Sequence, residues 1–214
     1  MADWRDRSQI SGDVVFFRYV TPGVEKNIDE VFVWDLDKTY LDTAIESITQ
    51  LLMTAIERAF NKKNIPGTSA LLQVLAKSWQ AQKGQSRFPL YFISASPPQM
   101  EARIAEKFNL DQIRPFGCFY KDNLQNLTPK RFWRLNKQVG YKIQALLQLR
   151  MKLKDDVKQI CWGDDSESDA IIYNLYSDIC ARRLGPQDLR NVLKNLAVTV
   201  EQVHLAQQQG LRLC

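Results

Sequence analysis

The chain has few of the residues that build soft-metal sites. Its 214 residues include one histidine and four cysteines, and no two cysteines form a Cys-x-x-Cys pair. Structural zinc sites need four Cys or His ligands, usually in closely spaced pairs. The sequence therefore excludes a histidine-rich zinc site. We interpret the cysteines as buried or free thiols in a reducing compartment: Cys118, Cys161, Cys180 and Cys214.

Long apolar runs are also missing. No stretch approaches the ~20 apolar residues that a membrane-spanning helix needs. Residues 1–7 are charged and lack the apolar core of a signal peptide. These absences predict a soluble cytoplasmic protein without a transmembrane segment.

Basic residues only slightly outnumber acidic residues. Lys and Arg number 29 against 24 Asp and Glu, which gives a net charge of +5. So small an excess favours anionic partners weakly, and nucleic acid is not expected as a partner. The hydrophobic fraction of 45% is sufficient for one domain with a sizeable core.

The most informative stretch is an apolar run that ends in two carboxylates. Residues 31–34 are apolar or β-branched throughout, which is typical of a strand buried on both faces of a parallel sheet, and Asp35 and Asp37 follow. Ligands bind beyond the carboxyl ends of such strands. Two close carboxylates repel each other unless a cation or a proton neutralises the pair. The alternative is that either aspartate only caps a turn or helix.

Apolar runs alternate with helical patterns along the chain. Strands are predicted at residues 14–20, 31–34, 89–93, 114–121, 157–162 and 178–181. Helices are predicted at 43–61 and 71–79, from 97, 128 and 141, at 171–176, and as one long helix from 187. Ser96 is expected to cap the helix that starts at Pro97, and Gly140 to separate two helices.

This alternation predicts an α/β fold: a three-layer α/β/α sandwich on a mostly parallel, Rossmann-like sheet. We expect an N-terminal arm at residues 1–27, a core at 28–185, and a C-terminal amphipathic helix packed on the core at 186–214. No insertion is long enough for a large cap domain.

Three further polar positions are expected at the same edge as Asp35. Ser94 is the first residue past the predicted strand at 89–93. From Lys142, a helix of roughly ten residues descends ~15 Å and a strand of roughly five climbs ~16 Å, which returns Asp164 to that edge. Lys130 and Arg131 are the alternative cations. The lysine precedes the acidic loop 163–169, whereas a response-regulator receiver places its lysine last.

The order Asp35-x-Asp37-x-Thr39, Ser94, Lys142 and Asp164 with Asp169 resembles the motifs of the haloacid dehalogenase-like (HAD-like) phosphatases. The resemblance implies that Asp35 attacks phosphorus and that Asp37 acts as the general acid. It also implies that Thr39, Ser94, Ala95 and Lys142 bind the phosphoryl group. Magnesium would be held by Asp35, the Asp37 carbonyl and Asp164, with support from Asp169 or Asp165.

Two segments are similar more narrowly to the fungal and bacterial phosphatidate phosphatase branch of that superfamily: residues 91–97 (YFISASP) and 163–173 (GDDSESDAIIY). The resemblance predicts a magnesium-dependent phosphomonoester hydrolase that works through an aspartyl-phosphate. Its substrate would be phosphatidic acid or another bulky phosphate ester. The alternatives are a non-catalytic module that binds phosphate or a partner, and a phosphatase of nucleic-acid ends.

Overall fold

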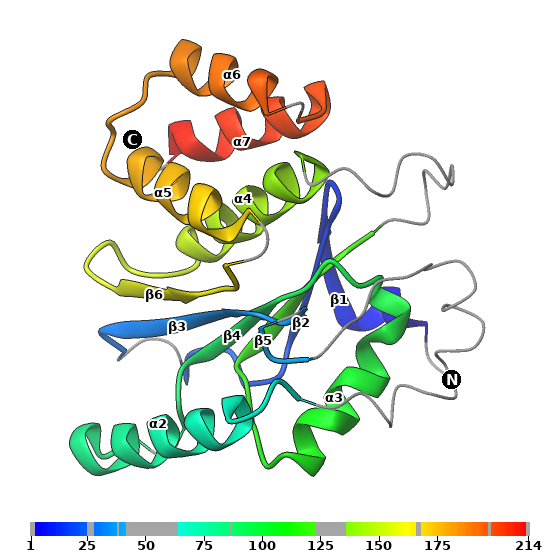
Figure 1. The fold of residues 1–214 in the computed structure, drawn as a ribbon, viewed down its shortest axis with the longest axis vertical. Coiled ribbons are helices and arrows are strands. Elements are labelled where there is room, and N and C mark those ends of the chain that lie inside the picture. The colour runs from blue at the N-terminus through cyan, green and yellow to red at the C-terminus, as the bar shows by residue number, and fades with distance from the viewer. Residues whose placement is uncertain are drawn as a thin grey trace.

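A six-stranded sheet lies at the centre of the protein (Figure 1). The computed structural model describes residues 3–24, 28–37, 39–41, 64–85, 87–122, 136–165, 168–196 and 198–212. No helix in this part of the chain is long and apolar enough to span a bilayer.

Four neighbouring strands of the sheet are parallel, and antiparallel pairing joins two further strands on one side of them. Its strand order is β1-β2-β5-β4-β3-β6. Strands β5, β4, β3 and β6 run parallel, whereas β2 is antiparallel to both β1 and β5. The order places β3 between β4 and β6. The strands are β1 (Ser8–Ser11), β2 (Val14–Arg18), β3 (Glu30–Asp35), β4 (Leu90–Ile93), β5 (Gly117–Lys121) and β6 (Lys158–Trp162).

Helices cover both faces of the sheet. Figure 1 shows α2 and α3 on one side and α4, α5, α6 and α7 on the other. The helices are α2 (Thr68–Lys83), α3 (Glu101–Leu110), α4 (Asn136–Arg150), α5 (Asp169–Cys180), α6 (Pro186–Asn195) and α7 (Val200–Arg212), with short 3-10 turns η1 (Trp4–Arg7) and η4 (Pro98–Met100). The predicted three-layer sandwich on a mostly parallel sheet is confirmed.

Strand β3 is apolar because both of its faces are buried. Val31 and Val33 belong to the core beneath α4 to α7. Phe32 and Trp34 belong to the opposite core, beneath α2 and α3. Successive side chains of a strand point to opposite faces, so an unbroken apolar run is needed to fill both layers.

Gly140 lies inside a helix rather than between two helices, contrary to the prediction. Helix α4 runs without a break from Asn136 to Arg150. A Cβ atom at Gly140 would lie 2.5 Å from side-chain atoms of both Val198 and Gln202. The glycine therefore permits close packing of α4 against the start of α7. Lys142 consequently lies in the second turn of α4, not at its start.

The predicted strand at residues 178–181 is wrong. Asp178, Ile179 and Cys180 form the last turn of α5. Ile172, Leu175, Tyr176 and Ile179 are all buried on one face of that helix. Their spacing of three and four residues continues the helical period through the segment.

The predicted single helix from residue 187 is two helices. The N–H of Val198 donates to the carbonyl of Leu193 (3.0 Å) beyond the end of α6. Thr199 then caps α7, because its Oγ1 accepts from the N–H of Gln202 (3.3 Å). Thr199 with Gln202 is a capping-box pattern, a signal for a new helix start in the sequence.

The helix expected to start at Pro97 is also displaced. Pro97 precedes the 3-10 turn η4 without a side-chain cap, and α3 begins only at Glu101. Ser96 turns instead toward Asp37, with its Oγ 3.5 Å from Oδ1. The helices predicted at 43–61 and from 128, with the alternative cations Lys130 and Arg131, lie outside the described residues.

Candidate active site

The carboxyl ends of three parallel strands bring distant segments to one edge of the sheet. Asp35 is the last residue of β3 and lies beside Ile93, the last residue of β4. On the other side of β3, Trp34 pairs with Trp162, the last residue of β6. Ser94 and Gly163 therefore begin the loops on either side of Asp35. This edge is where open α/β sheets bind their ligands.

Lys142 joins this edge from the helical layer above the sheet. Its Nζ lies 2.8 Å from Oδ1 of Asp35 and 2.5 Å from Oδ1 of Asp169. Asp169 is the first residue of α5. The exposed fractions of Asp35, Lys142 and Asp169 are 1%, 2% and 1%. Two carboxylates from different elements thus hold one buried ammonium group.

The charges of this cluster are set mainly by burial. Burial raises the pKa of the Asp35 carboxyl well above its usual range; Lys142 opposes this rise, and Asp169 and Asp37 add to it. Burial alone would lower the pKa of Lys142, but attraction to Asp35 and Asp169 outweighs it and raises that pKa. Lys142 is therefore cationic at neutral pH, and the site is short of positive charge.

Asp37 is held by the loop that follows β4. Its Oδ2 accepts hydrogen bonds from the Ser94 hydroxyl (2.8 Å) and from the N–H of Ala95 (3.0 Å). The Ser94 hydroxyl in turn accepts from the N–H of Ser96 (3.1 Å). A carboxylate fixed by two donors in this way has a defined orientation at the mouth of the site.

Tyr141 fixes the same loop from helix α4. Its hydroxyl donates to the carbonyl of Ser94 (2.7 Å), and its side chain is fully buried. Tyr141 precedes Lys142, so adjacent residues of α4 contact the loop after β4 and the end of β3. We did not predict this contact, because tyrosine beside a lysine on an apolar helix has no signal that separates it from ordinary core packing.

Gly163 allows Asp169 to approach the end of β6. A Cβ atom at position 163 would lie 2.2 Å from Oδ2 of Asp169. The ring of Trp162, the residue before Gly163, stacks on the ring of Trp34 with centroids 5.0 Å apart. The carbonyl of Trp162 accepts a hydrogen bond from the Tyr173 hydroxyl (3.0 Å). These contacts fix the strand end that Asp164 follows.

Thr39 lies on the opposite side of Asp35 from the lysine. Its Oγ1 is 3.5 Å from Oδ2 of Asp35. The two oxygens of Asp35 thus have different surroundings. One faces the Lys142 ammonium, and the other faces a hydroxyl that can rotate toward a ligand.

The donor set near Asp35 fits a hard divalent cation. No cluster of three or more Asp, Glu, His or Cys side chains within the described ranges converges on one point as a metal cage. Mg²⁺ does not need one, since it usually binds one or two carboxylates and keeps waters or phosphate oxygens. The buried carboxylates of Asp35 and Asp169 share the single ammonium of Lys142, and Asp37 lies close enough to raise the pKa of Asp35. A divalent cation would therefore add the positive charge that this site lacks.

The contacts of Asp169 differ from those expected of a direct metal ligand. Its Oδ1 faces the Lys142 ammonium, and its Oδ2 lies against Gly163. The remaining candidate donors are Asp35, the Asp37 carbonyl and Asp164.

Comparison with known proteins identifies one family. Residues 31–187 match the family described as "Phosphatidate phosphatase APP1, catalytic domain". This range begins within β3 and ends in the first turn of α6, so it contains Asp35, Ser94, Lys142 and Asp169 together. No curated protein and no solved structure matches the chain significantly.

Proposed function

Since the chain belongs to the phosphatidate phosphatase APP1 catalytic-domain family and is a phosphatase of that type, we propose that it hydrolyses a phosphomonoester by a magnesium-dependent route through an aspartyl-phosphate. The observation that carries the proposal is the contact of Lys142 with Asp35 at the end of the central strand. A carboxylate nucleophile needs a nearby cation that neutralises the oxygens of the phosphoryl group whose phosphorus it attacks.

In the first step, Asp35 attacks phosphorus as a carboxylate, which the Lys142 ammonium and a bound cation would keep ionised, and the ester P–O bond breaks. The leaving alkoxide takes a proton from Asp37, which must enter the step protonated. In the second step, water attacks the aspartyl-phosphate while Asp37, now ionised, accepts a proton from it. Asp35 is regenerated, inorganic phosphate leaves, and Asp37 is again protonated.

The loop after β4 and Lys142 would gather the charge that spreads over the phosphoryl oxygens. Ser94 and Ala95 present a hydroxyl and an N–H beside Asp37. Thr39 presents a second hydroxyl beside Asp35. Phosphoryl transfer depends mostly on such positioning and electrostatic stabilisation. When bound, Mg²⁺ would add positive charge, held by Asp35, the Asp37 carbonyl and Asp164.

A shallow groove of about 10 Å³ beside Asp37 would contact the part of the leaving group nearest to phosphorus. It starts at Asp37 and Ser96 and continues along Leu41, Met100 and Ile104, with Arg103 and Lys107 at its side. Asp37 protonates the leaving group in this mechanism, so the group that departs must lie on its side of the site. Its apolar side chains would contact the first carbons of a lipid leaving group.

Phosphate release tests the proposal. Wild-type protein is expected to hydrolyse p-nitrophenyl phosphate and dioctanoyl phosphatidic acid with Mg²⁺ and to stop when EDTA is added. Asp35→Asn should lose this activity by at least about 10³-fold, because the amide is no nucleophile. Mass spectrometry of acid-quenched wild type should find one phosphoryl group on the peptide that contains Asp35.

Asp156→Asn is the matched control, since Asp156 is exposed and precedes β6 at the opposite edge of the sheet. Retained turnover in Asp35→Asn would remove Asp35 as the nucleophile. A wild-type protein that binds Mg²⁺ and phosphate but hydrolyses neither ester would favour the binding-module alternative.

A further inference from the structure

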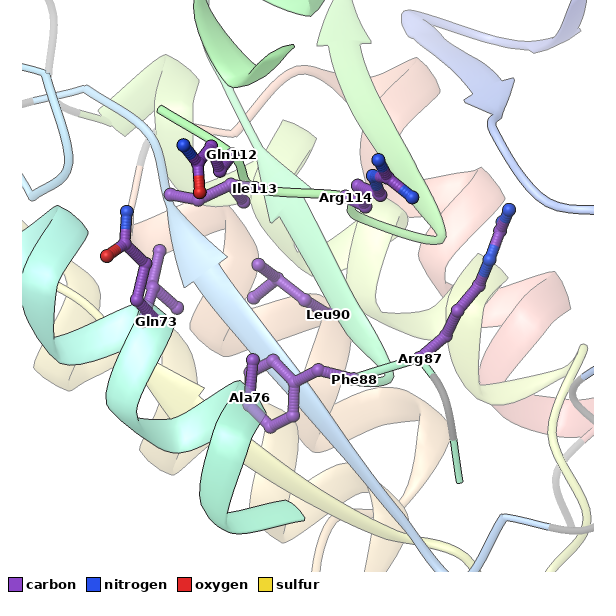
Figure 2. Close-up of a pocket in the computed structure, with 9 residues that line it drawn as sticks. Gln73, Ala76, Arg87, Phe88, Leu90, Gln112, Ile113 and Arg114 are labelled. Atoms are coloured by element: carbon purple, nitrogen blue, oxygen red, sulfur yellow. The ribbon is translucent and has the colours of Figure 1, made fainter. Parts of the chain in front are cut away.

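A second pocket lies at the opposite edge of the sheet from Asp35. Its volume is about 260 Å³, and it opens between α2 and the segment that joins α3 to β5 (Figure 2). Leu90, which lies in it, is the first residue of β4, whereas Ser94 follows the last. The lining residues are Leu72, Gln73, Ala76, Arg87, Phe88, Leu90, Gln112, Ile113 and Arg114.

The inner wall of the pocket is apolar and firmly packed. Leu72, Phe88, Leu90 and Ile113 are all less than 9% exposed. The Phe88 ring lies 4.5 Å from the Phe32 ring, centroid to centroid. Such a wall offers contact to an apolar group and does not need to rearrange to receive it.

The rim of the pocket is cationic. Arg87 and Arg114 lie on one side of it and the amides of Gln73 and Gln112 on the other (Figure 2). Within the described ranges, no carboxylate pairs with either guanidinium group. Guanidinium groups are suited to bidentate binding of carboxylate and phosphoryl oxygens.

The rim also contains a residue in an unusual backbone conformation. Gln112 has φ +58°, in the left-handed region. The side chain of Gln73 holds this turn through a hydrogen bond to the carbonyl of Asp111 (2.9 Å). The turn directs the chain so that Ile113 enters the wall and Arg114 reaches the rim.

We propose that this pocket binds a compact organic anion, in which a carboxylate or phosphoryl head group carries a short apolar chain. The two arginines would hold the head group, and Phe88, Leu90 and Ile113 would contact the chain. A volume of about 260 Å³ is near the lower end for ligand pockets, roughly 300 Å³, which limits the apolar part to a short one. The site is separate from the catalytic edge and does not depend on the proposed reaction.

Titration of the ¹⁵N-labelled full chain with octanoate and with octylphosphonate, neither of which can be hydrolysed, tests the site by NMR. We expect saturable shifts at Leu72, Leu90 and Ile113. Arg87→Gln/Arg114→Gln should raise the dissociation constant at least tenfold. Saturable binding of either acid supports the proposal, and the acid with the lower dissociation constant identifies the preferred head group.

The matched control is Arg182→Gln/Arg190→Gln, which removes the same charge from exposed positions in the helical layer across the sheet and should bind as wild type does. The proposal fails if the Arg87/Arg114 variant, with a folded spectrum, binds as tightly as wild type. It also fails if neutral octyl glucoside or inorganic phosphate alone saturates the same residues equally well, or if wild type shows no saturable shifts there.

Discussion

The ammonium of Lys142 lies 2.8 Å from Oδ1 of Asp35, in a region where both side chains are almost completely buried. This contact joins the central strand to the helical layer above it. It also makes the site asymmetric, because one oxygen of Asp35 is occupied by the lysine. In the proposed mechanism, stability and activity therefore both depend on Lys142.

Lys142→Met is expected to lower both stability and activity. The substitution leaves Asp35 and Asp169 buried without their common partner, and breaking a buried ion pair costs about 3–5 kcal/mol. The free energy of unfolding, measured in urea, should fall by roughly this amount. Phosphate release should fall at least about 100-fold, because the charge on the phosphoryl oxygens is no longer neutralised.

Lys152→Met provides the comparison, since Lys152 is exposed just beyond the same helix. It should change both quantities little. If Lys142→Met is as active as wild type, the lysine has only a structural role.

Ser94→Ala and Ser96→Ala separate two hydroxyl groups of one loop. Ser94 donates to Asp37 at 2.8 Å and is fully buried. Its removal should cost about 1.5–3 kcal/mol, typical of a hydrogen bond to a charged group, and lower the rate at least tenfold. Ser96 lies 3.5 Å from the same carboxylate, too far for a strong bond, so Ser96→Ala should lower the rate by less than about twofold.

For both serine variants, the free energy of unfolding is measured in urea and the rate of phosphate release is measured with the same substrate. Equal losses in the two would show that the loop backbone, rather than the Ser94 hydroxyl, orients Asp37.

Gly163→Ala tests whether the position of Asp169 controls Lys142. The new methyl group would lie 2.2 Å from Oδ2 of Asp169, so the aspartate must shift from the position in which it contacts Lys142. Overpacking of this kind costs about 1–3 kcal/mol, and we expect at least a tenfold loss of phosphate release. Gly185→Ala is the control, because a Cβ there would come no closer than 3.4 Å to Asp188.

Full activity in Gly163→Ala would show that Asp169 can shift without displacing Lys142. The melting temperature of each glycine variant, measured by circular dichroism, separates a local change at the site from a loss of fold.

Much of the sheet could be predicted from the sequence, because buried parallel strands have a strong local signal. Residues 31–34 are apolar without interruption, and they form the centre of β3. The carboxyl ends of parallel strands meet at one edge of a sheet, so the sequence predicts that Asp35 and Ser94 lie near each other. The placement of Lys142 at this edge rests on the expected lengths of a helix and a strand and on the order of the motifs, with Lys130 and Arg131 as alternatives. Helix α4 starts at Asn136 rather than near Tyr141.

The wrong predictions arise where tertiary packing determines the role of a residue. Gly140 was interpreted as a break, but it serves close packing against Val198 and Gln202, which are distant in sequence. The contact of Asp37 with Ser94 depends likewise on the loop conformation after β4. Interactions between segments far apart in the chain leave no periodic pattern in the sequence, so pattern analysis cannot find them.

Met100→Glu is expected to reduce the preference for a lipid substrate. Met100 lines the groove that begins at Asp37, and a carboxylate there would be poorly solvated beside an acyl chain and would repel a phosphate ester. The ratio of kcat/KM for dioctanoyl phosphatidic acid to that for p-nitrophenyl phosphate should fall at least tenfold, about 1.4 kcal/mol of transition-state binding. Gln99→Glu adds the same charge at the neighbouring, exposed position and should keep the ratio within about twofold. An unchanged ratio in Met100→Glu would mean that the leaving group does not lie along this groove, even if both esters are hydrolysed.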